Sequence, residues 1–166
     1  MNEVEIESIG KLKPHPDVPE EWLISKPILI PYFDEIKLEF TLQCDLETDK
    51  SFLVNADKAI SNFLSKNVSD RLSDSLNVFN NYREIQDYYD TQTWGAPPLQ
   101  INHENEIWQY VNPGSVFICR GSNIDDNIYI LITCECDWEP EHGLQLVFKN
   151  GLELTKVSGI DYDPTE

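Results

Sequence analysis

The chain has 166 residues, of which 40% are hydrophobic, and this length and composition fit one globular domain with a closed core. Asp and Glu number 30 against 12 Lys and Arg, which gives a formal net charge of -18. A nucleic-acid binder is disfavoured, because such proteins neutralise phosphates with a basic patch and the lysines here are scattered among acids. The charge suits a cationic protein partner, or it serves only to keep the protein soluble.

The first residues contain no basic start followed by an apolar run, and no segment reaches the length of a bilayer span. We therefore expect a cytoplasmic protein that does not enter a membrane. Four cysteines are too few for the disulfide framework of a small secreted domain. Three of them lie in strand-like runs, where a free thiol packs as a small apolar group, so we expect reduced thiols and no disulfide between Cys134 and Cys136.

Residues 1–26 predict an irregular entry to the domain, marked by Pro14, Pro16 and Pro19. Residues 27–43 predict a β-hairpin. An apolar run meets the turn Asp34-Glu35, and apolar and polar residues alternate beyond it. The prolines of this hairpin indicate an edge of the sheet.

Two consecutive amphipathic helices are predicted within residues 55–90. Apolar residues recur at helical spacing over 55–67 and again over 69–89, where Ser69 can cap the second helix. Residues 91–105 then predict a long surface loop, because they contain Gly95, Pro97 and Pro98.

The region 106–157 predicts a run of antiparallel strands, near residues 106–111, 115–120, 127–137, 143–148 and 152–157. The order of strands, helices and more strands is typical of an α+β domain. We expect a mainly antiparallel sheet with the two helices packed on one face. The two groups of strands could join in one sheet, or the hairpin could pack separately.

The connection between the third and fourth of these strands concentrates reactive side chains. From Cys134 to Leu144 it reads Cys-Glu-Cys-Asp-Trp-Glu-Pro-Glu-His-Gly-Leu. Cys134, Cys136 and His142 raise the question of zinc, but structural zinc sites draw cysteine pairs with two or more intervening residues. Paired acids elsewhere in the chain lack the graded spacing and glycine of a calcium loop. We therefore expect no bound metal and no cofactor.

Glu139, Glu141 and His142 could act as an acid-base couple if a substrate cleft adjoined this connection. The sequence supplies no nucleophile elbow, phosphate loop or arginine clamp to complete such a site. The competing interpretation is a structural turn, in which Gly143 takes a backbone conformation closed to other residues. Trp138 is expected to anchor the strand end in the core, the alternative being an exposed interface residue.

The string from Cys134 to Phe148, followed by Gly151 and Leu154, resembles the C-terminal hallmark of an uncharacterised bacterial family, a domain of unknown function. Small acidic proteins of this kind are similar to immunity proteins, which bind and neutralise a toxin made beside them. The resemblance implies that the turn residues of the hallmark build the scaffold, while acidic helices and loops recognise the partner. The scaffold residues would be Trp138, Glu139, Glu141, His142 and Gly143. The partner-binding residues would be Asp70, Asp74, Glu84, Asp87, Tyr88, Tyr89, Asp90 and Trp94.

The function expected from these features is neutralisation of a basic, nuclease-like bacterial toxin by direct binding. Two alternatives remain at this point. The protein could be a small enzyme that uses Glu141 and His142, or a structural scaffold.

Overall fold

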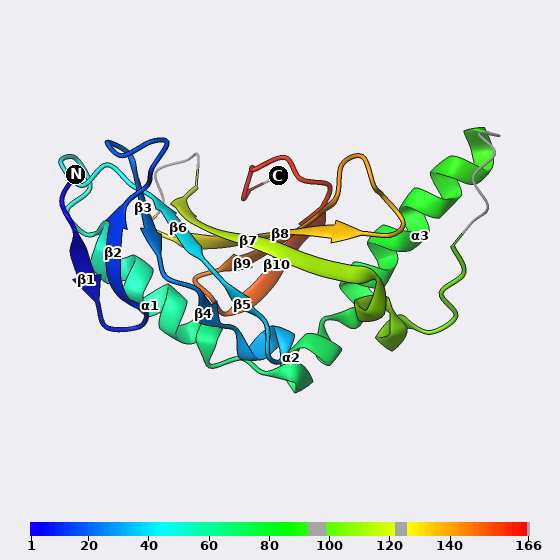
Figure 1. Cartoon of the computed structure of the whole chain (residues 1–166). Helices are drawn as coiled ribbons and strands as arrows, with labels where there is room; N and C mark the ends of the chain where they lie inside the picture. Colours follow the sequence, from blue (N-terminus) through cyan, green and yellow to red (C-terminus); the bar gives the residue numbers. More distant parts are fainter. Residues whose placement is uncertain (93–98, 122–125, 166) are drawn as a thin grey trace.

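The computed structural model describes residues 1–92, 99–121 and 126–165, and it confirms the α+β fold (Figure 1). Within these ranges eight strands form one sheet in the order β1-β2-β3-β6-β7-β8-β9-β10. The strands are β1 (Val4–Ile6), β2 (Gly10–Pro14), β3 (Trp22–Ser25), β6 (Phe40–Gln43), β7 (Val111–Arg120), β8 (Ile128–Cys136), β9 (Leu144–Lys149) and β10 (Glu153–Ser158). The helices are α1 (Phe52–Leu64), α2 (Val68–Ser73), α3 (Ser75–Gln92) and the 3-10 helices η1 (Pro31–Phe33) and η2 (Glu104–Tyr110).

The helices cover one face of the sheet. In Figure 1, α1 and α2 lie below the sheet and α3 rises along its right-hand end, while the C-terminal segment lies above it. Among the described strands, β6 and β7 pair in parallel and the other neighbours pair antiparallel. The parallel pair joins the N-terminal strands to the C-terminal ones, so the two groups form one sheet.

The prediction of an irregular segment over 1–26 is wrong. This segment forms β1, β2 and β3, which continue the sheet to its edge. The prolines that suggested a loop lie at the end of β2, where Pro14 pairs with Leu23, and in the turn that follows. A proline is tolerated at a strand end because the backbone N–H it lacks is not needed there. Short alternations such as Val4-Glu5-Ile6 carried the strand signal.

The hairpin predicted over 27–43 is divided in two. β4 (Ile28–Leu29) and β5 (Lys37–Leu38) pair with each other as a separate two-stranded sheet around η1. β6 then enters the large sheet between β3 and β7. One alternating run of sequence therefore serves two sheets, because the chain changes partner at Glu39 without losing its period.

The helix predicted over 69–89 is also divided. Asn67 caps α2, with its side chain accepting from the N–H groups of Ser69 and Asp70, so Ser69 is not the cap. Asp74 ends α2, and its carboxylate accepts a 3.0 Å hydrogen bond from the hydroxyl of Tyr32. α3 begins at Ser75, which is fully buried and accepts from the indole of Trp108. These long-range partners break the helix in a place that helical spacing alone does not mark.

The strand expected near 106–111 is the 3-10 helix η2 over most of its length. His103 caps it, accepting a hydrogen bond from the N–H of Asn105 through Nδ1. Ile107 is the buried residue of this helix. One apolar residue after a polar run does not distinguish a 3-10 helix from a short strand in the sequence. β7 starts only at Val111.

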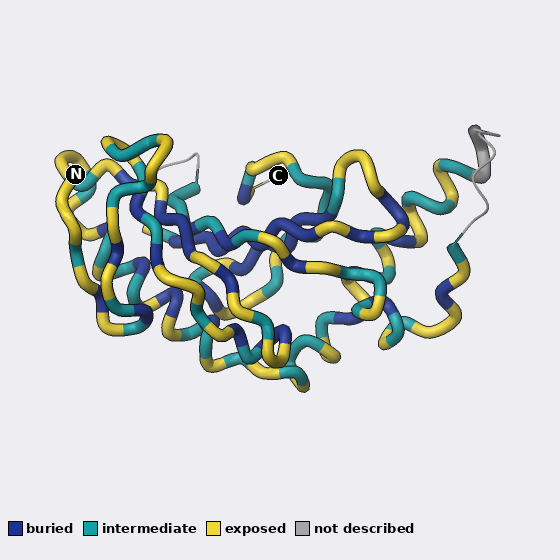
Figure 2. Tube along the Cα trace, in the orientation of Figure 1, coloured by how far each residue is buried: buried dark blue, intermediate teal, exposed yellow. Residues whose placement is uncertain are grey.

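The core between the sheet and the helices is rich in aromatic rings. Tyr32 is fully buried and packs edge-on against Phe148, with ring centroids 5.3 Å apart, while Phe63 of α1 lies 5.0 Å from Phe148. Figure 2 shows the central strands as a buried band through the molecule. β8 and β9 are buried on both faces, because residues 159–165 lie across the side that the helices leave open.

The turn between β9 and β10 lies directly against α1. Asn150 and Gly151 both have positive φ, 53° and 70°, as a tight Asn-Gly hairpin turn requires. The side chain of Asn62 in α1 donates to the carbonyl of Asn150. The turn backbone approaches the helix so closely that a Cβ on Gly151 would lie 1.9 Å from the carbonyl oxygen of Ala59.

Candidate functional site

The β8–β9 turn is organised around a buried carboxylate. Glu139 is only 6% exposed, and its Oε1 accepts from the backbone N–H groups of Glu141 at 3.2 Å and His142 at 3.4 Å. The same oxygen lies 3.5 Å from Nδ1 of His142, whose ring is largely exposed. Glu139 therefore closes the turn, and it, rather than Glu141, is the carboxylate beside the imidazole.

Gly143 ends the turn in the conformation that the sequence predicts. Its φ is 64°, in the left-handed region, and its N–H donates to the carbonyl of Glu139 at 3.0 Å. A Cβ at this position would lie 2.8 Å from the carbonyl oxygen of Cys134 and 2.8 Å from Cδ1 of Ile160. Conformation and space both require glycine here.

Trp138 fixes the turn to α3. It is 3% exposed, its indole N–H donates to Oδ1 of Asn81 at 3.0 Å, and its ring meets that of Tyr82 edge-on at 6.0 Å. The hydroxyl of Tyr82 in turn donates to the carbonyl of Leu99. Trp138 is therefore a core anchor, and it sets the position of the turn relative to α3.

The last turns of α3 carry exposed acids and tyrosines next to the β8–β9 turn. Glu84, Asp87 and Tyr88 are exposed, and their spacing of three and four residues places them on one side of the helix. Tyr89 lies toward the β8–β9 turn. The charge of Glu139, partial desolvation and the charge of Glu141 together raise the pKa of its phenol.

We call the group formed by Glu84, Asp87, Tyr88, Tyr89 and Glu141 the acidic α3 surface. It brings together four of the residues that the sequence proposes for partner binding, and it adds Glu141, which the sequence assigns to the scaffold. The side chain of Asp90 and the whole of Trp94 lie outside the residues that the structure describes, so this surface is defined without them.

Asp70 and Asp74, also proposed for partner binding, make contacts within the fold. Asp70 accepts from the N–H of Asn67 and completes the capping box of α2. Asp74 is half-buried against Tyr32, and desolvation raises the pKa of its carboxyl although the tyrosine hydrogen bond opposes this. Neither residue belongs to the acidic α3 surface.

A hollow of about 820 Å³ opens beside the β8–β9 turn. Besides Pro140 and the strand backbone, it is lined by Glu135, Asp137, Glu141 and His142, and by Ile160 from the C-terminal segment. Over the described ranges, no group of three or more His, Cys, Asp or Glu side chains is placed to hold a metal ion. The hollow could admit a small polar molecule beside the imidazole.

A second hollow, of about 840 Å³, lies at the opposite end of the sheet among acids such as Glu20 and Glu47. Arg120 lines this hollow. It donates two hydrogen bonds to the carboxylate of Asp49, through Nε at 2.6 Å and through Nη2 at 3.1 Å. This two-point contact, opposed in part by desolvation, holds the pKa of Asp49 below its usual value. The pair ties the end of β7 to the start of α1, and we assign it a structural role.

Residues 8–164 match a protein family described as a domain of unknown function, DUF6985. The chain belongs to this family. No curated protein and no solved structure matches the chain. The family match spans both α3 and the β8–β9 turn, so the acidic α3 surface lies within the family's domain. In the described part of the chain, no helix is long and apolar enough to cross a membrane.

The four thiols should react slowly in the folded protein. Burial raises the pKa of Cys44, Cys119 and Cys136 to about 11, and it also raises the pKa of Cys134. Since the thiolate is the reactive form, we expect alkylation by iodoacetamide at pH 8 to be at least about tenfold slower than in denaturant. Mass spectrometry should count four free thiols after unfolding.

Cys119 is the least buried of the four, so it should be alkylated first, and Cys119→Ser should remove the fastest phase. A count of two free thiols in the unfolded, unreduced protein would contradict the expectation, because it would reveal a disulfide.

Proposed function

We propose that this protein binds a basic protein partner through the acidic α3 surface, and that the partner is a toxin which it neutralises in the cytoplasm, as immunity proteins do. The observation that carries the proposal is the grouping of exposed carboxylates with tyrosines beside the β8–β9 turn. Tyrosines provide amphipathic contact area with few rotamers to immobilise, which suits an interface. With a net charge of -18, the protein as a whole attracts a cationic partner.

Carboxylates and tyrosines would affect different rate constants of binding. Exposed carboxylates such as Glu84 and Asp87 would steer a cationic surface into place and raise the association rate constant. Tyr88, whose side chain is largely exposed, would be buried on docking and lower the dissociation rate constant. The burial of Trp138 and Glu139 keeps the turn rigid, so the surface is already formed before the partner arrives.

The test is surface plasmon resonance against the product of the neighbouring gene. Replacing Glu84 by Gln together with Asp87 by Asn should lower the association rate constant about tenfold at low salt, and raised salt should narrow this difference, because exposed charges are screened. Tyr88→Ala should mainly raise the dissociation rate constant.

A matched control removes two exposed acids at the far end of the sheet. Glu20→Gln with Glu47→Gln changes the net charge by the same amount but leaves the acidic α3 surface intact. An equal loss of association rate in both double variants would show that only overall charge matters. No binding at micromolar concentration would remove the support for a toxin as the partner.

One observation favours an enzyme as a second candidate. The exposed ring of His142 lies 3.5 Å from the buried carboxylate of Glu139, beside the hollow of about 820 Å³. A carboxylate can orient an imidazole for general-base catalysis in this way. His142→Gln separates the candidates, because it should abolish a hydrolytic activity and leave partner binding through α3 unchanged.

A further inference from the structure

The face of the sheet opposite the helices, which we call the open face, is apolar at its centre. Strand register places Phe117 of β7, Leu131 of β8 and Val147 of β9 side by side on it, and Lys156 of β10 follows in the same row. Leu131 and Val147 are almost fully buried. Since none of the described helices lies on this face, the C-terminal segment must exclude the water.

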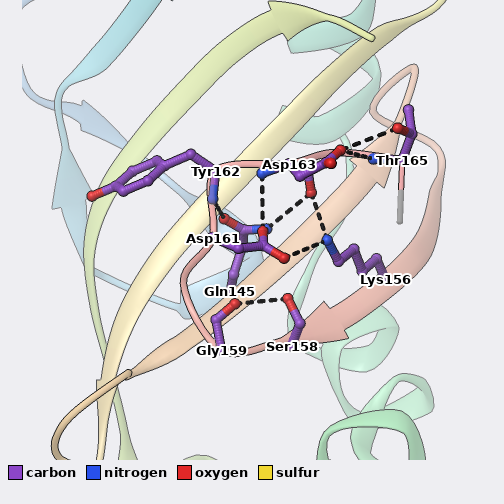
Figure 3. Close-up of polar contacts among 8 residues, drawn as sticks. All are labelled: Gln145, Lys156, Ser158, Gly159, Asp161, Tyr162, Asp163 and Thr165. Carbon is purple, nitrogen blue, oxygen red and sulfur yellow. Dashed lines mark hydrogen bonds and ion pairs between the residues drawn. The ribbon is translucent and has the colours of Figure 1, made fainter. Parts of the chain in front are cut away.

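The C-terminal segment, residues 159–165, is held by the side chain of Gln145 (Figure 3). Gln145 projects from β9 and is fully buried. Its Nε2 donates to Oδ1 of Asp161 at 2.8 Å and to the carbonyl of Asp163 at 3.3 Å, while its Oε1 accepts from the N–H of Tyr162 at 3.0 Å. One amide thus binds the backbone of the segment at Tyr162 and Asp163 and the carboxylate of Asp161.

Lys156 of β10 binds the same segment from the other side. Its Nζ donates to Oδ2 of Asp161 at 2.8 Å and to the carbonyl of Asp163 at 2.7 Å. These contacts hold the carboxylate of Asp161 between an ammonium and an amide, and Figure 3 shows both groups pointing at it. A carboxylate bound in this way is strongly preferred over a neutral side chain.

The segment otherwise has little secondary structure to hold it. The N–H of Ile160 donates to the carbonyl of His142 at 2.9 Å, and over the described residues 161–164 we find no further backbone-to-backbone hydrogen bond. Tyr162 has φ 57°, which is costly for a residue with a side chain, and its ring meets Phe117 edge-on at 5.5 Å. Side chains of the sheet therefore hold this segment as a receptor holds a peptide.

Beyond the covered part the open face carries lysines, with Glu5 opposite Lys11 in the register of β1 and β2. Lys11, Lys13 and Lys26 line a hollow of about 290 Å³ on β2 and β3, with Glu3 at 3.5 Å from Lys11. In the sequence these lysines look scattered among acids, but the register of β2 and β3 brings them together.

We propose that the open face is a binding site for an acidic segment of a partner protein, with the pattern Asp-aromatic-Asp, and that the chain's own residues 159–165 occupy it in the resting state. The site lies on the opposite side of the sheet from the helices and takes an acidic partner, so it is independent of the acidic α3 surface.

The burial of Gln145 supports this assignment. If the C-terminal segment were only a fixed cover, an apolar residue at 145 would exclude water without the desolvation that a buried amide suffers. The side-chain amide of Gln145 instead uses both its donor and its acceptor to bind the segment. A tethered segment also acts at an effective concentration in the millimolar range, so a partner can bind only when this internal competitor is weakened or outmatched.

The experiment uses the full chain and a fluorescein-labelled peptide, Gly-Ile-Asp-Tyr-Asp-Pro-Thr, followed by fluorescence anisotropy. Asp161→Ala in the protein removes the internal carboxylate but leaves Gln145 and Lys156 in place. This variant should bind the peptide at least about tenfold more tightly than the parent, because the internal competitor is weakened. Asp161→Asn serves as a second variant, chosen to keep the shape of the side chain.

Three controls decide the outcome. Glu47→Ala removes one exposed acid outside both proposed binding surfaces and should bind the peptide no better than the parent. Adding Lys156→Met to Asp161→Ala should abolish the gain, and so should a peptide whose first Asp is replaced by Asn. If neither Asp161 variant binds the peptide more tightly than Glu47→Ala, or if Lys156→Met changes nothing, the proposal is overturned, whatever the result for the basic partner.

Discussion

Gly151→Ala should destabilise the protein by about 3–5 kcal/mol or prevent it from folding, because the new methyl group would overlap the backbone of α1. The Cβ would lie 1.9 Å from the carbonyl oxygen of Ala59 and 2.9 Å from the amide nitrogen of Phe63. Both are backbone atoms within α1, so neither can rotate away. Urea unfolding, followed by tryptophan fluorescence, would measure the loss.

Gly10→Ala is the matched control. Gly10 has a similar positive φ of 78°, but a Cβ there would have no neighbour within 4 Å. This variant should lose only the conformational cost, about 1 kcal/mol. The difference between the two variants isolates the contact with α1, and equal losses would contradict the close approach of the turn to the helix.

Gly143→Val is the second substitution with a large expected effect, a loss of about 3 kcal/mol. Gly143 has φ 64°, and its Cβ would press on the carbonyl oxygen of Cys134 and on Ile160. The strain should also loosen the C-terminal segment, because Ile160 anchors its start through the hydrogen bond to His142. Thermal unfolding would report the first effect, and hydrogen exchange at residues 160–163 the second.

Gly114→Ala provides the comparison for this variant. Gly114 lies in β7 without a positive φ, and its Cβ would be in ordinary contact with the carbonyl oxygen of Thr133 at 3.5 Å. It should melt close to the parent. If Gly143→Val did so too, the structural role of the β8–β9 turn would be wrong and a functional role for it would gain weight.

The parts of the fold that sequence predicts are those where one face of a local element is buried. The apolar spacing of α1 and the alternation of β7, where Val116 and Ile118 are buried, follow this rule. The division between α2 and α3 at Asp74 cannot be predicted from local spacing, because it depends on Tyr32, which is 42 residues away in the chain. The N-terminal strands are not predicted, because the prolines indicate a loop and the alternation of apolar and polar residues there is short. These short segments form strands by pairing with one another.

Some features of the candidate site can likewise be predicted from the sequence, and others cannot. The glycine of the β8–β9 turn and the burial of Trp138 follow from residue type. That Glu139 lies inside the turn and Glu141 beside Tyr89 could not be read from a string containing both acids. Gln145 gave no signal at all, since a polar residue in an alternating strand predicts exposure, and only the returning C-terminal segment buries it.

The parallel pairing of β6 with β7 has a kinetic consequence. Neighbours on either side of it are joined by short connections or lie close in sequence, so β1-β2-β3-β6 and β7-β8-β9-β10 can each assemble from nearby residues. The β6–β7 contact must instead close the long loop from Gln43 to Val111, which contains all of α1, α2 and α3. Contacts of such sequence separation are slow to form. The two half-sheets should therefore appear early, and their docking should set the folding rate of the domain.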